Sequence, residues 1–321
     1  MMTYLLLVVG FALLIIGADY FVKGASNISA ILRVPPILVG LTIVSFGTSS
    51  PEATVSIIAA LNGNDDVSLG NVMGSNMFNT LFVLGMTAFI APLLVKSQTI
   101  RKEIPFSFLA GITLLVLMAD TFLQNFTSNL LTRSDGIILL LIFAVFLYYV
   151  YELARKSRND VEEIQPHIAE KDKSWFKNGT FTLAGLAAIV FGGDLVVKNS
   201  TDIALSLGMS EALVGLTIVA VGTSLPELVT SIIAALKKES EIALGNIIGS
   251  NIFNILFVLG ASATISPIGV NSALFTDMIL LIAFTVIVLI FALTHFTIGK
   301  REGLFLALSY IVYMVYIILR N

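Results

Sequence analysis

The sequence LVGLTIVSFGTSSPE at residues 38–52 returns as LVGLTIVAVGTSLPE at residues 213–227. The match extends beyond these segments without a gap, and residues 38–85 share 31 of 48 positions with residues 213–260. The identical positions include the polar motifs GTS, PE, LGN, GSN and FN as well as apolar stretches. Polar residues inside apolar segments point to function rather than to stability alone. The chain is therefore expected to contain two copies of one functional unit.

The composition excludes an ordinary soluble protein. Hydrophobic residues make up 57% of the 321 and charged residues only 12%, whereas soluble domains carry about 25% charged residues. The sequence has no Cys and two His. This excludes disulfides, thiolate metal sites and zinc sites of the His-Glu-x-x-His kind. The expected solvent for most of the chain is a lipid bilayer.

Ten apolar runs are candidates for transmembrane helices, which need about 20 residues to cross the hydrocarbon core. They cover residues 4–22, 35–61, 67–93, 104–119, 136–154, 179–197, 210–236, 241–266, 273–294 and 303–319. The first run lacks the basic start and the cleavage site of a signal peptide, so we expect it to be a span. The predicted fold class is an all-α membrane protein with ten transmembrane helices.

The Lys and Arg residues predict the orientation. Fifteen of the 18 basic residues fall on one side of the predicted spans. The other side has only Arg133, Lys198 and Arg320. Because basic residues gather on the cytoplasmic side, we expect a multi-pass protein of the cell membrane with both termini extracellular.

Asp19 is spaced for an i, i+4 ion pair with Lys23.

The two copies occupy residues 1–154 and 179–321, joined by a cytoplasmic linker at residues 155–178. Each copy has five predicted spans, an odd number, so the second copy enters the membrane from the opposite side and the repeats are inverted. Inverted repeats are typical of secondary transporters, whose substrates bind at the repeat interface near the midplane, often on broken helices. The sequence thus predicts a transporter with broken core helices rather than an enzyme.

The first GTSxPE motif interrupts an apolar run near its middle. Proline lacks an N–H and clashes with the carbonyl four residues back, so Pro51 should release the carbonyl of Gly47. On a helix, Glu52 shares one face with Thr48 and Ser49. Carboxylate, hydroxyl and carbonyl oxygens are the ligands that hard cations prefer.

The second motif repeats this arrangement with Thr223, Ser224, Pro226 and Glu227. An unpaired acidic side chain at the bilayer centre costs about 2.5 to 3.5 kcal/mol on insertion scales. The two runs that carry the motifs contain no basic residue. Glu52 and Glu227 therefore need a compensating partner, which a bound cation or a proton would supply.

The GSNxFN motifs of the third and eighth runs add hydroxyl and amide oxygens. Their candidate ligands, co-facial in each helix, are Ser75, Asn79, Ser250 and Asn254. Asn76 and Asn251 are as readily explained by hydrogen bonds between helices. The complete donor set is oxygen, which suits Ca²⁺ and Na⁺ rather than softer metals. One site that holds either ion, but not both, is what an antiporter needs.

These motifs resemble the two alpha repeats of the sodium/calcium exchanger family, of prokaryotic type, within the calcium/cation antiporter superfamily. The resemblance covers essentially the whole chain. It implies that Glu52 and Glu227 are the principal Ca²⁺ ligands, shared with Na⁺. It also implies a role in the calcium and sodium sites for Thr48, Ser49, Ser75, Asn79, Thr223, Ser224, Ser250 and Asn254, and for backbone carbonyls near Ser45 and Ala220.

The resemblance further implies electrogenic exchange of roughly three Na⁺ per Ca²⁺, with the first and sixth helices sliding past the core to alternate access. Some relatives carry Asp where this chain has Asn254, which argues against potassium coupling. The linker at residues 155–178 is too short for the calcium-sensing domains of animal relatives, so regulation by such domains is not expected.

Three alternatives remain open. A Ca²⁺/H⁺ exchanger on the same scaffold is possible because glutamates in a partly dry site can carry protons, although the hydroxyl-rich flanks favour Na⁺. An intramembrane hydrolase would need paired acids in suitable motifs, which Asp19 and Asp194 lack. A passive channel suits broken helices around a midplane site less well. The expected partners are the transported ions and lipid, with no cofactor, nucleic acid or obligatory protein.

Overall fold

The computed structural model describes residues 2–160, 174–208 and 220–320, and the described chain is mostly helical. The helices of the first half are, in order, α1 (Met2–Leu32), α2 (Pro36–Val39), π-helix η1 (Gly40–Val44), α3 (Ser45–Thr48), α4 (Ser50–Leu61), α5 (Asp65–Met77), π-helix η2 (Phe78–Val83), α6 (Leu84–Ile90), π-helix η3 (Thr99–Glu103), α7 (Ile104–Leu117), α8 (Asp120–Leu123) and α9 (Arg133–Asp160).

The second half contains α10 (Trp175–Ser206), α12 (Ala220–Gly222), α13 (Leu225–Leu236), α14 (Ser240–Ile252), π-helix η6 (Phe253–Leu259), α15 (Gly260–Ile265), α16 (Ala273–His295) and α17 (Lys300–Arg320). Each of the ten predicted runs overlaps one helix or a series of consecutive helices, and residues 210–219 of the seventh run lie outside the described residues. Among the described residues, seven helices are long and apolar enough to cross a membrane.

The first and sixth helices are longer than predicted. The apolar run at residues 4–22 stops at Lys23, yet α1 continues to Leu32, and α10 continues past residue 197 to Ser206. Polar side chains beyond the apolar run find partners between the two helices, as in the hydrogen bond from Asn27 Nδ2 to Asn178 Oδ1, 2.8 Å long. The predicted linker is also partly helical, since α9 and α10 include its two ends.

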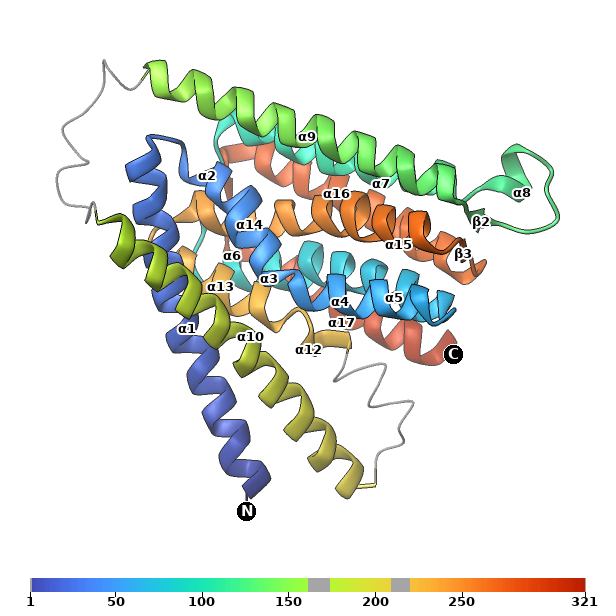
Figure 1. Ribbon diagram of the computed structural model, residues 1–321, viewed down its shortest axis with the longest axis horizontal. Coiled ribbons are helices and arrows are strands. Elements are labelled where there is room, and N and C mark those ends of the chain that lie inside the picture. Colours follow the sequence, from blue (N-terminus) through green and yellow to red (C-terminus); the bar gives the residue numbers. More distant parts are fainter. Residues whose placement is uncertain (1, 161–173, 209–219, 321) are drawn as a thin grey trace.

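Helices α1 and α10 pack against each other in antiparallel directions and cross the other helices at a steep angle (Figure 1). Glycines make this contact close. A Cβ atom on Gly17 would lie 2.9 Å from the carbonyl oxygen of Gly185, and one on Gly192 would lie 2.8 Å from that of Gly10. Small residues at a helix interface let the two backbones approach.

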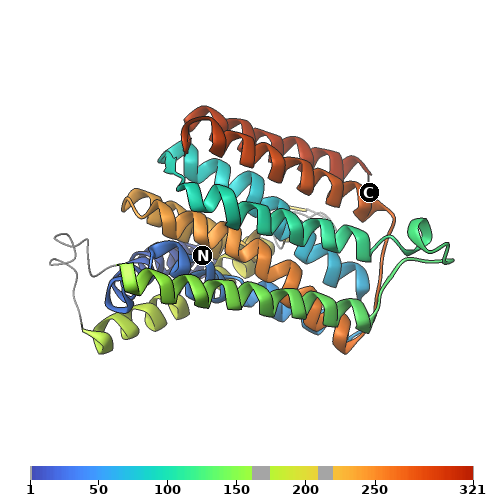
Figure 2. The same ribbon diagram turned by 90° about the horizontal axis from the view of Figure 1, so that it is seen from above.

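The remaining helices form the body of the molecule. Figure 2 shows the red helices α16 and α17 at one edge of this body and the green helix α9 at the other. Between them, α4 packs on α5 and α13 packs on α14, while η1 packs on α14. The repeated motifs therefore lie on helices in the centre of the body, and α14 is almost entirely buried.

Short strands connect the two halves. Strand β1 (Leu93–Leu94) pairs antiparallel with β4 (Thr297–Ile298), and β2 (Leu130–Leu131) pairs antiparallel with β3 (Ile268–Gly269). An ion pair adds a further tie, because Lys237 Nζ lies 2.7 Å from Asp19 Oδ1. The predicted pairing of Asp19 with Lys23 is therefore wrong, since the turn after α13 brings a cation to Asp19 from outside its own helix.

Candidate functional site

Both core helices break at the predicted motifs. Between α3 and α4 the backbone of Ser49 leaves helical geometry, with φ −82° and ψ 8°. Ser224 does the same before α13, with φ −94° and ψ 9°. Pro51 and Pro226 then lie in the first turn of the next helix, where a missing N–H costs no hydrogen bond.

The breaks place each glutamate at the start of a half-helix. Glu52 lies in the first turn of α4 and Glu227 in the first turn of α13. Both side chains are fully buried. The positive end of the helix dipole stabilises a carboxylate at this position, by up to about 2 kcal/mol in partly buried geometries.

The two halves exchange hydrogen bonds at this point. Ser224 Oγ donates to Glu52 Oε1 over 2.7 Å, and Ser49 Oγ lies 2.7 Å from Glu227 Oε1. Ser250 Oγ lies 2.9 Å from Ser49 Oγ, which adds the eighth predicted run to the cluster. Three motifs from distant parts of the sequence thus meet at one buried site.

Several buried oxygens of the predicted ligand set have no hydrogen-bond partner among the described residues. They are Glu52 Oε2, Glu227 Oε2, Ser75 Oγ, Asn79 Oδ1 and Asn254 Oδ1. Buried polar atoms almost always have a partner, and an unpaired one is costly. Carboxylate, hydroxyl and amide oxygens are suitable ligands for a hard cation, so the donor set fits Ca²⁺ or Na⁺.

The two asparagines of the predicted ligand set stand on π-helices. Asn79 belongs to η2 and Asn254 to η6, and both side chains are fully buried. Single π-helical turns within α-helices are frequent at functional sites. Asn254 Nδ2 donates to Asn76 Oδ1 over 3.3 Å, and Asn251 Nδ2 donates to Thr80 Oγ1 over 2.8 Å.

The remaining predicted residues lie on the segments that lead into the two helix breaks. Thr48 Oγ1 is 3.0 Å from Asn246 Oδ1 and 3.3 Å from the carbonyl oxygen of Ser45, which is buried. Thr223 is partly buried just before Ser224. Ala220 is the first residue of α12, in the chain that leads to the second break.

Two asparagines that were not predicted as site residues donate hydrogen bonds to the main-chain oxygens of the two glutamates. Asn246 Nδ2 donates to Ser231 Oγ over 2.9 Å and to the main-chain oxygen of Glu227 over 3.4 Å. The first half repeats these contacts with Asn71, Ser56 and Glu52. The signal was present, because the LGN motif is identical in both copies and lies one helical turn before GSN.

The sodium/calcium exchanger protein family matches residues 2–152 and 179–319, nearly the whole chain. The chain belongs to the sodium/calcium exchanger family. It is 39% identical over 312 residues to the putative antiporter CaxA of Alkalimonas amylolytica, covering 95% of both proteins. It is 32% identical over 340 residues to the sodium/calcium exchanger MaX1 of Methanosarcina acetivorans, covering 97% of both.

The fold agrees with this assignment. The structure matches that of the sodium-calcium exchanger NCX_Mj soaked with Na⁺ and Sr²⁺, with a TM-score of 0.83 and 28% identity over 98% of each chain. As a member of the exchanger family, the protein is a transporter rather than an enzyme. Its long apolar helices make it a multi-pass membrane protein, as the composition predicted.

Proposed function

We propose that this exchanger moves Ca²⁺ against Na⁺ across the cell membrane by alternating access. The observation that carries the proposal is the reciprocal pair of hydrogen bonds between Ser224 and Glu52 and between Ser49 and Glu227. It gathers two carboxylates and their neighbouring oxygens into one buried cluster at the contact between the halves, where inverted-repeat transporters bind their substrates.

The proposed architecture has ten membrane-crossing helices in two inverted repeats, residues 1–154 and 179–321, with both termini extracellular. Support comes from the antiparallel α1–α10 pair and the equivalent breaks before α4 and α13. The proposed ligands are the twelve residues of the two GTSxPE and GSNxFN motifs and their flanks identified in the sequence. Their two negative charges fit one Ca²⁺ or a small set of Na⁺. We propose electrogenic exchange of roughly three Na⁺ per Ca²⁺.

Uptake of Ca²⁺ into vesicles tests the coupling ion. Purified protein is reconstituted into vesicles loaded with Na⁺, and external Ca²⁺ is added with pH clamped equal on both sides. We expect Ca²⁺ uptake that stops when the internal Na⁺ is replaced by choline. Uptake that follows only a pH gradient would instead support a Ca²⁺/H⁺ exchanger, which the two buried carboxylates also allow.

Replacement of the glutamates tests the site. We expect Glu52→Gln and Glu227→Gln each to weaken Ca²⁺ binding by about a hundredfold or more, because each removes one of two charges at the site and affinity follows ligand charge. Glu103→Gln is the matched control, since Glu103 is fully buried but lies in η3 and bonds Tyr149 and Gln98. Calorimetric Ca²⁺ titration measures the affinities, and unchanged affinity in both site variants would reject this assignment.

A further inference from the structure

The turn between α13 and α14, residues 237–239, is fastened to α1 at two points. Lys237 Nζ lies 2.7 Å from Asp19 Oδ1 and donates to the main-chain oxygen of Asp19 over 2.8 Å. Two residues further along the turn, the carboxylate of Glu239 accepts a hydrogen bond from Ser26 Oγ. Asp19 and Ser26 are seven residues apart, about two helical turns, so they share one face of α1. This face is the one that meets the turn.

The equivalent turn of the first copy has a similar backbone conformation. It joins α4 to α5 at residues 62–64, which the repeat aligns with residues 237–239. The middle residue has a positive φ in both turns, 71° at Gly63 and 63° at Lys238. The N–H of the next residue donates to the carbonyl five residues back, over 2.8 Å in the first copy and 2.9 Å in the second. The two turns therefore differ in their side chains rather than in their backbones.

The side chains of the first copy's turn are uncharged. Two asparagines, Asn62 and Asn64, stand where the second copy has its lysine and its glutamate. The acidic partner on the long helix is retained, since the repeat aligns Asp194 of α10 with Asp19 of α1. An asparagine amide carries no charge and forms no ion pair with that acid. The α10 side therefore has the acid of the ion pair without its lysine.

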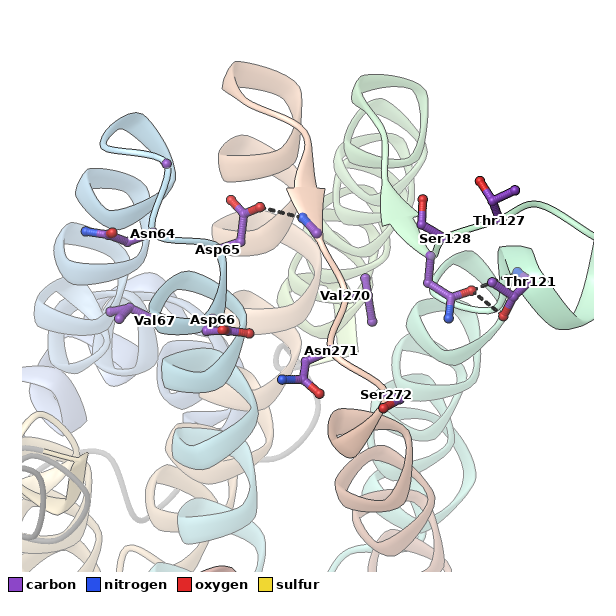
Figure 3. A pocket seen from close by; sticks show the side chains of 13 residues that line it. Asn64, Asp65, Asp66, Val67, Thr121, Thr127, Ser128, Val270, Asn271 and Ser272 are labelled. Atoms are coloured by element: carbon purple, nitrogen blue, oxygen red, sulfur yellow. Dashed lines mark hydrogen bonds between the residues drawn. The ribbon is translucent and has the colours of Figure 1, made fainter. Parts of the chain in front are cut away.

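The structure shows the same difference in its contacts. Helix α1 packs along α13, whereas the equivalent helices α10 and α4 do not pack in this way in the part of the chain that the structure describes. Thr201 of α10 is the equivalent of Ser26, and its buried hydroxyl has no hydrogen-bond partner among the described residues. Figure 3 shows Asn64 pointing away from the 2.8 Å hydrogen bond between Gly269 N–H and Asp65 Oδ2, which holds the start of α5. The contact between turn and long helix is thus made in the second copy's turn.

This difference matters in a transporter built from two inverted copies, in which one bundle moves against the other. Because the copies are equivalent, exchanging their conformations converts the state closed on one side into the state closed on the other. A contact that both copies form would stabilise both states alike. A contact that one copy alone forms stabilises one state more than the other and shifts the equilibrium toward it.

We propose that the Asp19–Lys237 ion pair, together with the Ser26–Glu239 hydrogen bond, is a latch that holds the protein closed on the side of the α13 turn. The latch biases the unloaded protein toward that state, because the opposite state has no equivalent ion pair. The inference rests on the proposed function, since it requires alternating access. The four residues lie outside the proposed ligand set and act on transport through the position of α1.

The Ca²⁺ affinities on the two sides of the membrane test the bias. Half-saturating Ca²⁺ for exchange is measured in membrane vesicles of both orientations. Each apparent dissociation constant is the intrinsic one divided by the fraction of protein open to that side. The ratio of the α13-turn side to the other side therefore follows the equilibrium between the two states.

We expect Asp19→Asn to lower this ratio by about two- to fivefold, the effect of losing an ion pair whose acid is half exposed. The acid is replaced rather than the lysine because Lys23 lines the same pocket and would remain as a second cation. Exchanging the charges, with Asp19→Lys and Lys237→Asp together, should return the ratio toward the wild-type value. A merely structural tie would instead slow transport from both sides and leave the ratio unchanged.

The first copy offers a gain-of-contact variant and a matched control. Asn62→Lys, at an exposed turn, places a lysine where it can pair with Asp194 in the opposite state, so it should also lower the ratio. Asp194→Asn removes the equivalent acid, which has no lysine to pair with in the wild-type turn, and should leave the ratio unchanged. An unchanged ratio in both Asp19→Asn and Asn62→Lys would overturn the latch, as would an equal fall in Asp194→Asn.

A chemical probe reads the position of α1 without transport. The chain has no Cys, and Val22, on the same face of α1 as Asp19 and Ser26, is fully buried in the wall of the pocket beside the turn. We expect a water-soluble maleimide to modify Val22→Cys about two- to fivefold faster when Asp19→Asn is added, because the thiol is reached when α1 leaves α13. Adding Asp194→Asn instead should not change the rate.

These readings separate the two proposals. Wild-type vesicles without Na⁺-driven Ca²⁺ uptake would reject the proposed function, whatever the modification rates of Val22→Cys. Normal Na⁺-driven uptake with equal modification rates in the presence and absence of Asp19→Asn would overturn the latch while the function stands.

Discussion

Several local contacts stabilise the negative charges of Glu52 and Glu227. Each lies at a half-helix N-terminus and is bonded through one oxygen by a serine of the other half. The second oxygen of each carboxylate has no hydrogen-bond partner among the described residues. A cation at that position would satisfy two negative charges at once. The supporting asparagines Asn71 and Asn246 hold the main chain that carries these carboxylates.

Replacing a supporting asparagine should weaken the site less than replacing a glutamate. We expect Asn246→Ala to lower Ca²⁺ affinity by about ten- to a hundredfold, because outer residues that orient ligands contribute that much in metal sites. Asn71→Ala should act in the same direction. Asn62→Ala, at an exposed turn, is the control. Calorimetric titration compares the variants, and wild-type affinity in both supporting-residue variants would show that the glutamates keep their positions unaided.

At the scale of the helices, small residues make the close packing of α1 against α10 possible. Its glycines alternate across the contact, Gly17 against Gly185 and Gly10 against Gly192. The repeat aligns Gly17 with Gly192 and Gly10 with Gly185. Exchanging each glycine for its equivalent in the other copy therefore turns one of these contacts into the other. This is the pattern that a two-fold relation between two inverted copies would produce.

Adding one methyl group at this contact should destabilise the protein. A Cβ on Gly185 would lie 2.6 Å from the backbone nitrogen of Phe21 and 2.7 Å from the carbonyl oxygen of Gly17. Overpacking of this kind costs about 1–3 kcal/mol, so Gly185→Ala should lower the midpoint of thermal unfolding by several degrees. Gly179→Ala, on the same helix and with no described atom within 4 Å, is the matched control. Equal midpoints would contradict the prediction.

At the scale of the whole molecule, contacts between the halves recur from end to end. They include the β1–β4 and β2–β3 pairs, the Lys96–Glu241 ion pair at 2.6 Å, and the serine–glutamate bonds at the centre. The proposed inversion places the equivalent turns after α4 and α13 on opposite sides of the membrane. Because basic residues predominate on one predicted side, we propose that the α13 turn, with Lys237 and Lys238, faces the cytoplasm.

Single cysteines in these equivalent turns test the orientation. We expect Asn62→Cys to react with an impermeant maleimide on intact cells, and Lys238→Cys to react only after the membrane is permeabilised, because both side chains are exposed at turns. The parent chain has no Cys and supplies the unlabelled control. Labelling of both positions from the same side would reject the inverted arrangement.

The sequence by itself determined the features that repeat or are local. Internal identity gave two copies, hydropathy located the apolar helices, and proline with its neighbouring glutamate marked both helix breaks. Such signals span a few turns of one helix. Tertiary structure alone decided which side chains meet: Ser224 with Glu52, Asn27 with Asn178, Lys237 rather than Lys23 with Asp19, and Arg320 with Asp277. Helical periodicity fixes the face on which a residue stands, but the residue opposite that face depends on how distant helices pack.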